Sequence, residues 1–232
     1  MSLVKIPFLA SGAVGAWLAL TPPNPPPAKE ECQRPKGIEK TFGKLVRLHA
    51  LVWKTVVIGG VFAEIASLLL ASYTPALAAN FLTHAPTPAP GLTPLFLLGW
   101  LATLLSGLLR LWCYHALGPL FTFEITLRAG HRLVTAGPYA YVRHPSYAGI
   151  VLGVAGTLLL HLGPGSWAHA AGWPRSLGGC AYAAGWGAAE AYVLLSILLR
   201  APQEDALLRA QFGAEWDAWA ARVPYRVVPG VF

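Results

Sequence analysis

Charged side chains are scarce in this sequence. Lys and Arg number 17 and Asp and Glu number 10, so 12% of the 232 residues are charged, whereas 55% are hydrophobic. A water-soluble domain of this length cannot cover its surface with so few polar groups. The shortage excludes the soluble globular class, and the mean hydropathy of +0.52 predicts an integral membrane protein instead.

Cysteine is also rare. The three cysteines, Cys32, Cys113 and Cys180, are odd in number, and no two of them are spaced as Cys-x-x-Cys. That pattern supports neither a disulfide framework nor a zinc site. We therefore expect all three thiols to be reduced and structural, and we expect no metal site.

Long apolar runs are what the sequence does contain. A helix needs about 20 apolar residues to cross a bilayer. Five runs approach that length, at residues 4–20, 48–73, 92–114, 146–162 and 177–200. The first run follows Lys5, as the apolar part of a signal peptide follows a basic residue. Signal peptides end in small residues at the cleavage site, whereas this run ends in Trp17 to Leu20, so we favour a membrane span. We predict an all-α, polytopic transmembrane bundle of about five spans.

The basic residues orient these spans. Lys and Arg counts are six in residues 21–47, none in 74–91, four in 110–143, one in 163–176 and four in 200–226. Because Lys and Arg accumulate on the cytosolic side of membrane proteins, residues 131–149 and the C-terminus are expected to share the cytosolic face. The basic residues follow the spans rather than clustering with aromatics on a soluble face, so no nucleic-acid partner is expected.

Small and acidic residues inside the runs suggest how the helices pack. Two groups of small residues predict close helix contacts: Gly149, Gly153 and Gly156 in the fourth run, and Gly178, Gly179, Ala183 and Gly187 in the fifth. Glu64 and Glu190 also lie inside runs. An ionisable residue in a span is a functional candidate, but we interpret both as groups that hydrogen-bond across the bundle.

A further helix is predicted after Arg200. Pro202 suits a first helical turn, and Glu204 and Asp205 suit the positive end of a helix dipole. Four apolar residues then recur at spacings of three or four, namely Leu208, Phe212, Trp216 and Trp219. We expect an amphipathic helix at the cytosolic face that ends before Pro224.

The polar stretch at residues 131–149 is the strongest indication of chemistry. It places two histidines, two arginines and three tyrosines between two apolar runs, with Gly137-Pro138 and His144-Pro145 as turns. Arg200 and Glu204, four residues apart, would reach the same membrane face. Structural interpretations stay open: Arg200 as a snorkelling residue paired with Glu204, Arg143 as a phosphate-facing anchor, and His144 with Tyr147 as a loop-closing pair.

The order of these motifs resembles the isoprenylcysteine carboxyl methyltransferase family. The similar residues are Leu133-Val134-Thr135-x-Gly137-Pro138-Tyr139, Arg143-His144-Pro145-x-Tyr147-x-Gly149, Arg200-x-x-x-Glu204-Asp205, Phe212-Gly213-x-x-Trp216 and Arg222-Val223-Pro224-x-Arg226-x-x-Pro229-Gly230. The resemblance covers about the last hundred residues. Phospholipid methyltransferases have a related core, so the acceptor is less specifically indicated than the superfamily.

The resemblance implies S-adenosyl-L-methionine as cofactor and a set of binding residues. The cofactor contacts would be His131, Arg132, Leu133, Val134, Tyr139, His144, Pro145, Ser146, Tyr147 and Glu204. Arg200, helped by Arg143, would contact the acceptor carboxylate. The family usually has Glu-Glu where this chain has Glu204-Asp205, which puts a role for the second acid in doubt. Glu124 is a weaker candidate for a polar cofactor contact.

The resemblance also implies the reaction: methyl esterification of the C-terminal prenylcysteine carboxylate of CaaX-processed proteins at the endoplasmic reticulum. The chain then divides into a first span (1–20), a Pro-rich, basic cytosolic linker (21–47), spans two and three (48–130) and a methyltransferase core (131–232). Membrane lipid and a prenylated protein or peptide are the expected partners. Alternatives are phosphatidylethanolamine N-methylation and a non-catalytic membrane scaffold. Two arginines favour a carboxylate over an amine, because they would repel a protonated amine.

Overall fold

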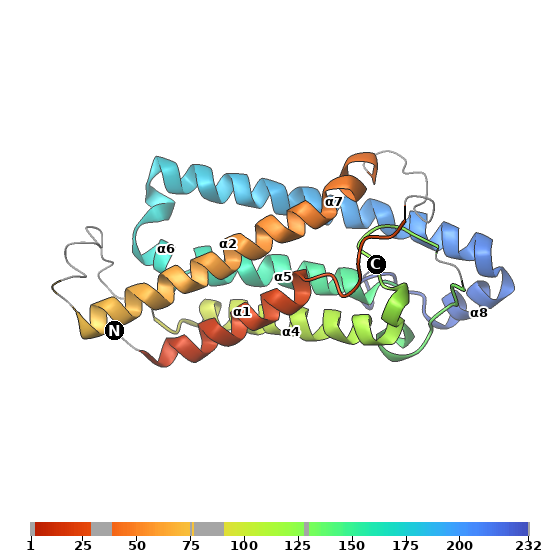
Figure 1. Cartoon of the computed structure of the whole chain (residues 1–232), viewed down its shortest axis with the longest axis horizontal. Coiled ribbons are helices and arrows are strands. Elements are labelled where there is room, and N and C mark those ends of the chain that lie inside the picture. The colour runs from red at the N-terminus through yellow and green to blue at the C-terminus, as the bar shows by residue number, and fades with distance from the viewer. Residues whose placement is uncertain (1–2, 29–38, 75, 77–90, 128–129, 232) are drawn as a thin grey trace.

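Long helices make up most of the protein. The computed structural model describes residues 3–28, 39–74, 76, 91–127 and 130–231, so Cys32 lies outside the described residues (Figure 1). The long helices are α1 (Ile6–Leu20), α2 (Glu39–Tyr73), α4 (Pro94–Leu117), α5 (Pro145–Leu162) and α7 (Leu177–Phe212). The short ones are η1 (Leu3–Lys5), η2 (Gly118–Leu120), η3 (Gly137–Ala140), α6 (Trp167–Ala170), η4 (Trp173–Arg175) and α8 (Ala214–Arg222). Among the described residues, five helices are long and apolar enough to cross a membrane, which confirms the all-α polytopic fold.

The second span is longer than predicted. Helix α2 begins at Glu39, whereas hydropathy placed its start at residue 48. The extra turns are rich in charge, but Phe42 is buried there and packs against Val193 and Ile197 of α7. The helix therefore extends beyond its apolar run, because a few apolar residues at helical spacing are buried there. The mean hydropathy of the segment does not reveal them, since charged residues lie between them.

The predicted separate helix starting at Pro202 is wrong. Helix α7 runs without a break through Pro202 to Phe212, and the chain turns only at Gly213, where φ is 52°. A proline ring removes one backbone hydrogen bond, and membrane helices tolerate this where neighbouring groups compensate. The predicted apolar face is therefore divided between two helices, with Trp216 and Trp219 buried on α8.

Glycines allow α1, α4 and α5 to approach closely. A Cβ atom on Gly107 of α4 would lie 2.4 Å from the Gly15 carbonyl oxygen of α1. A Cβ on Gly156 of α5 would lie 2.6 Å from the Thr103 backbone nitrogen of α4. Gly149 and Gly153 likewise face α4, so the predicted close contact of the fourth span is confirmed.

The corresponding prediction for the fifth span is wrong for its glycines. A Cβ on Gly178 or Gly187 would meet no other atom within 4 Å, and Gly179 faces Trp173 of its own preceding turn. Gly178, Gly179 and Gly187 thus bring α7 against no other long helix among the described residues, and Gly179 packs against the short helix η4. Helix α7 instead touches the bundle through larger side chains such as Val193 and Ile197.

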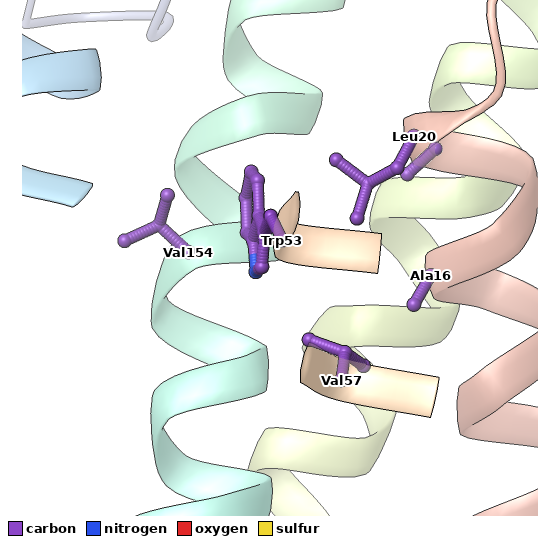
Figure 2. Packing of buried hydrophobic residues seen from close by; sticks show 6 residues of the cluster. Ala16, Leu20, Trp53, Val57 and Val154 are labelled. Atoms are coloured by element: carbon purple, nitrogen blue, oxygen red, sulfur yellow. The ribbon is translucent and has the colours of Figure 1, made fainter. Parts of the chain in front are cut away.

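A layer of buried apolar side chains joins α1, α2 and α5 beneath the polar end of the bundle (Figure 2). It contains Ala16 and Leu20 of α1, Trp53 and Val57 of α2, and Val154 of α5. The Trp53 indole nitrogen donates a hydrogen bond to the Thr157 hydroxyl across 3.3 Å. This layer fixes the ends of three spans relative to one another below the candidate site.

A buried ion pair holds the opposite end of the bundle. The Lys5 ammonium contacts the Glu64 carboxylate of α2, and it donates a hydrogen bond to the Gly165 carbonyl oxygen across 2.6 Å. Lys5 and Glu64 are both buried. Glu190 of α7 accepts a hydrogen bond from Trp186 at 3.1 Å. Glu64 is therefore paired across the bundle, as interpreted. The hydrogen bond to Glu190 comes from its own helix, and Glu190 Oε2 has no hydrogen-bond partner among the described residues, so the interpretation of Glu190 stays a prediction.

Candidate active site

Two segments that are about fifty residues apart in the sequence, residues 143–147 and 200–205, meet at one end of the bundle. Pro145 is the first residue of α5, where its fixed φ suits a helix start. His144 precedes it with φ −126° and ψ 63°, and its side chain does not cap the helix. The imidazole is directed instead toward α7, where Glu204 and Asp205 are consecutive residues.

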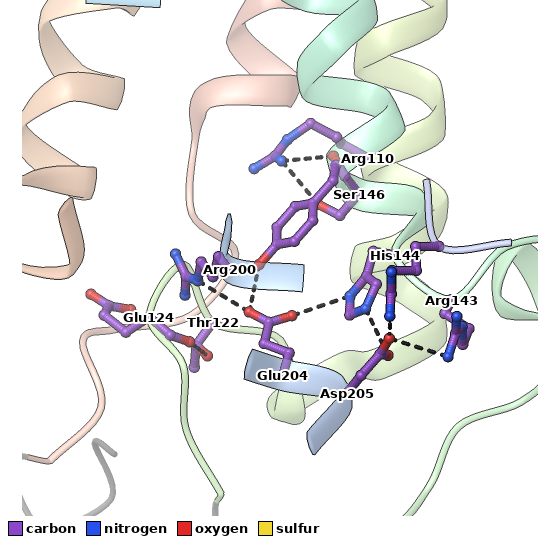
Figure 3. Close-up of polar contacts among 11 residues, drawn as sticks. Arg110, Thr122, Glu124, Arg143, His144, Ser146, Arg200, Glu204 and Asp205 are labelled. Carbon is purple, nitrogen blue, oxygen red and sulfur yellow. Dashed lines mark hydrogen bonds and ion pairs between the residues drawn. The ribbon is translucent and has the colours of Figure 1, made fainter. Parts of the chain in front are cut away.

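Glu204 receives three polar contacts (Figure 3). Its Oε1 accepts a 2.5 Å hydrogen bond from the Tyr147 hydroxyl and a 3.1 Å hydrogen bond from Arg200 Nε. Its Oε2 lies 3.2 Å from His144 Nδ1. The structure thus brings together four of the predicted site residues, because α7 continues through Pro202 and keeps Arg200 and Glu204 on one side.

Asp205 is held by three cationic side chains (Figure 3). Its Oδ1 lies 3.0 Å from His144 Nε2, and its Oδ2 lies 2.9 Å from Arg226 Nε and 3.1 Å from Arg143 Nη1. Backbone hydrogen bonds from Arg143 and His144 to the carbonyls of Tyr225 and Arg226 hold the same tail at 3.0 and 2.7 Å. Asp205, which the sequence left in doubt, therefore fastens the C-terminal segment to the site.

Each ring nitrogen of His144 contacts a carboxylate. Burial opposes protonation of the imidazole, but the hydrogen bonds and charges of Asp205 and Glu204 outweigh it and raise the pKa of His144. The ring also stacks on Tyr147 with centroids 5.3 Å apart. A protonated His144 donates to both acids and so sets the spacing between them.

A cavity opens beside this cluster, at the ends of α2, α4, α5 and α7. Eleven of the twelve predicted site residues line it: His131, Arg132, Leu133, Val134, Tyr139, Arg143, His144, Ser146, Tyr147, Arg200 and Glu204. Pro145 is buried and starts α5 without lining the cavity. Glu124 also lines it, but its carboxylate is paired with Arg47 at 2.6 Å.

His131 and Tyr139 form the wall nearest α8. Buried His131 Nδ1 has no hydrogen-bond partner among the described residues, and burial lowers the pKa of His131. Tyr139 is buried beside Trp219, whose indole nitrogen donates to the Tyr139 carbonyl across 3.1 Å. Burial also raises the pKa of Tyr139 well above its usual range. A neutral imidazole with an unmatched nitrogen therefore faces the cavity.

The two arginines predicted to act together lie apart. Arg143 is on the far side of His144 from Arg200, next to Asp205 (Figure 3). Its guanidinium donates to the Pro224 carbonyl across 3.1 Å and lies 5.6 Å from the Trp216 ring centre. Arg200 is buried beside Glu204, with its guanidinium 5.7 Å from the Phe42 ring centre.

Sequence reasoning missed several cavity-lining residues. Phe42, His49 and Trp53 come from α2, and Arg110 and Ser106 come from α4. Arg110 was counted only as a basic residue for orientation, although it lies inside an apolar run, where an ionisable residue is a functional candidate. The residues of α2 and α4 other than Arg110 carried no local signal, because only the packing of the bundle brings them to the cavity.

Comparison with known proteins supports the resemblance. Residues 98–169 match the model of the isoprenylcysteine carboxyl methyltransferase (ICMT) family. Over 124 residues, or 53% of this chain, the sequence is 30% identical to the cobalt-zinc-cadmium resistance protein CzcN of Cupriavidus metallidurans. The match covers 46% of that relative, so the chain spans about half the length of the curated protein it matches. The family match supports a membrane methyltransferase.

Proposed function

We propose that this chain, a membrane methyltransferase that carries the ICMT family segment in residues 98–169, esterifies the C-terminal carboxylate of a prenylcysteine with a methyl group from S-adenosyl-L-methionine. The observation that carries the proposal is the cluster of Arg200, Glu204, Tyr147 and His144 beside one cavity. The cavity combines these polar groups with apolar side chains, as a substrate with a charged end and a hydrocarbon chain requires.

The cavity offers groups that suit the cofactor. Bound S-adenosyl-L-methionine supplies a methyl group on a positively charged sulfur atom. Glu204 accepts three contacts in the protein, and a carboxylate has about four acceptor positions, so it retains capacity for an ammonium or hydroxyl group. His131 Nδ1 has no partner among the described side chains, and Leu133 and Leu208 provide apolar walls for a flat ring. The contacts of His144 and Tyr147 with Glu204 hold its carboxylate in one orientation.

Arg200 is proposed to hold the acceptor carboxylate. A C-terminal carboxyl has a pKa of roughly 3.3 to 3.7, so at neutral pH it is already a nucleophile and needs no general base. A guanidinium can hold a carboxylate in two places and leave a lone pair for attack. The contact between Arg200 Nε and Glu204 fixes the plane of the guanidinium. Arg143 supports the same site indirectly, by holding Asp205 and the tail.

The apolar part of the cavity suits a hydrocarbon chain. Phe42 and Trp53 of α2, Ile150 of α5, and Val193 and Ile197 of α7 line it. Each buried CH₂ group contributes about 0.8 kcal/mol, so a prenyl chain favours an acceptor site within the membrane over one in water. The charged cofactor would enter from the aqueous side, where His131 and Arg132 lie.

The Lys and Arg distribution supports a cytosolic position for this end of the bundle. The endoplasmic reticulum follows from the family resemblance alone. A prenylated protein or peptide is the proposed partner, with membrane lipid around the spans.

The test uses the purified full chain in detergent with methyl-labelled cofactor. One reaction receives a farnesylcysteine analogue and another receives phosphatidylethanolamine. We expect base-labile, volatile label from the first acceptor and none on the second. Transfer only to the phospholipid would overturn the proposal in favour of N-methylation. Transfer to neither acceptor would favour a non-catalytic scaffold.

A further inference from the structure

Arg110 of α4 is a buried cation fixed at the inner end of the cavity. Only 4% of its surface is exposed, and it lines the cavity with Arg200 and Glu204. Its Nε donates to the Ala19 carbonyl across 2.6 Å and to the Tyr114 hydroxyl across 3.1 Å. These contacts hold the guanidinium in one orientation at the end of α1.

The α5 side of Arg110 is also fixed. Arg110 Nη1 lies 2.9 Å from the Ser146 hydroxyl and 3.3 Å from the Ser146 carbonyl oxygen (Figure 3). None of the hydrogen bonds among the described residues uses Nη2. A guanidinium has five N–H donors, so two of them remain for a group in the cavity.

The charge of Arg110 is not matched by an acid. Among the described residues, no carboxylate lies within ion-pair distance of Arg110, whereas Arg47, Arg143 and Arg200 each have one. The neighbours of Arg110 are aromatic, with the Phe123 ring centre 5.0 Å and the Tyr114 ring centre 5.5 Å from its guanidinium carbon. Such rings compensate a buried cation only in part. An unpaired buried charge is costly, so a ligand anion is the missing partner.

The start of α5 adds a second positive feature at the same place. Ser146 is the second residue of this helix. Pro145 has no N–H, and the N–H groups of Tyr147 and Ala148 donate to the His144 carbonyl, so among the described hydrogen bonds the Ser146 N–H is the donor of the first turn that is not used. The N-terminal end of a helix also carries a partial positive charge that favours anions. Ser146 lines the cavity beside Arg110, so the two features face the same space.

We propose that Arg110, Ser146 and the first turn of α5 form a carboxylate-binding subsite distinct from Arg200. The inference rests on the proposed function for the identity of the ligand. Two substrates of that reaction carry a carboxylate: the acceptor at its C-terminal cysteine and the cofactor at its methionine part. A planar guanidinium beside a helix start matches the two oxygens of either group.

A structural role for Arg110 leads to a different expectation. The same contacts join the end of α1 to the start of α5, so losing Arg110 would lower stability in either case. Only a ligand-binding role predicts that the variant also loses its preference for a charged ligand over an uncharged one. Trp100 of α4 also joins α4 to α1, through a 2.9 Å hydrogen bond from its indole nitrogen to the Ser11 hydroxyl, and it does not line the cavity. Trp100→Phe is therefore the control for a loss of stability without a change in the subsite.

The experiment measures dissociation constants with the full chain in detergent for wild type, Arg110→Gln, Arg110→Lys and Trp100→Phe. One ligand pair is a farnesylthio carboxylic acid and its carboxamide. The other is S-adenosylhomocysteine and its decarboxylated analogue. We expect the preference for the acid in one pair to fall about tenfold or more in Arg110→Gln, because a hydrogen bond to a charged group contributes about 1.5 to 3 kcal/mol. Arg110→Lys keeps part of this preference, and Trp100→Phe keeps all of it.

The ligand pair whose preference for the acid falls in Arg110→Gln identifies whether the acceptor or the cofactor supplies the carboxylate. Unchanged preferences in both pairs for Arg110→Gln would overturn the subsite, as would a wild-type protein that prefers neither acid. The proposed function is judged separately, by ester formation with wild type. If no ester forms but Arg110→Gln still loses the preference for S-adenosylhomocysteine, the function fails and the subsite stands.

Discussion

His144 Nε2 lies 3.0 Å from Asp205 Oδ1, and this contact joins the start of α5 to the C-terminal part of α7. The other ring nitrogen contacts Glu204, so one imidazole fixes two consecutive acids. The arrangement depends on the charge of His144, because a neutral imidazole has only one N–H to donate. Because His144 can donate to both carboxylates only when it is protonated, the geometry of the site should depend on pH.

The free energy of unfolding should fall as the pH rises through neutrality, because His144 loses its proton. The folded state raises the pKa of His144 above its ordinary value of 6.5. A raised pKa contributes stability that is fully present below 6.5 and is lost as the pH passes the higher folded-state pKa. We expect the thermal midpoint of wild type to drop between about pH 6 and pH 9 by more than that of His144→Asn. Parallel pH profiles for the two proteins would contradict the prediction.

Arg200→Gln should impair use of the acceptor more than binding of the cofactor. Loss of a charged donor to the acceptor carboxylate should lower kcat/KM for a farnesylcysteine analogue by about 10- to 100-fold. The dissociation constant of S-adenosylhomocysteine should change little. Arg209→Gln is the control, because Arg209 lies on the same helix, is exposed and pairs with Asp217 at 2.8 Å. Equal losses in the two variants would remove Arg200 from the acceptor site.

The sequence predicted the spans because apolar runs report directly on membrane burial. It could not predict the true start of α2, since Phe42 and its neighbours are separated by charged residues and only their contact with α7 makes them core. The continuity of α7 through Pro202 also depends on tertiary packing, because proline alone predicts a helix start there.

The residues that line the cavity were predicted in part for a related reason. The residues from His131 to Tyr147 formed a polar stretch that stood out between apolar runs, and Arg200 and Glu204 stood out by spacing. Arg110 stood out only as an ionisable residue inside an apolar run. That no described carboxylate lies within ion-pair distance of it is visible only in the structure. The separation of Arg143 from Arg200 is likewise a three-dimensional property, set by the pairing of Arg143 with Asp205.

Gly107→Ala should destabilise the bundle strongly. A Cβ at this position would lie 2.4 Å from a backbone oxygen of Gly15, so α1 and α4 would have to separate. Overpacking of this kind typically costs about 1 to 3 kcal/mol. Gly185→Ala is the control, because a Cβ there meets nothing within 4 Å and alanine favours the helix. Thermal unfolding in detergent should show a lower midpoint for the first variant and no loss for the second.

Lys5→Met should destabilise the protein through the acid it leaves behind. Glu64 would remain buried without its cationic partner, and breaking a buried pair in this way typically costs about 3 to 5 kcal/mol. Replacing both residues, in Lys5→Met with Glu64→Leu, should restore most of the loss, since an apolar pair of similar volume removes the unpaired charge. Lys44→Met, at an exposed position of α2, should leave the thermal midpoint unchanged. A double variant no more stable than Lys5→Met would show that the hydrogen bond from Lys5 to the Gly165 carbonyl, rather than the pairing with Glu64, holds this end of the bundle.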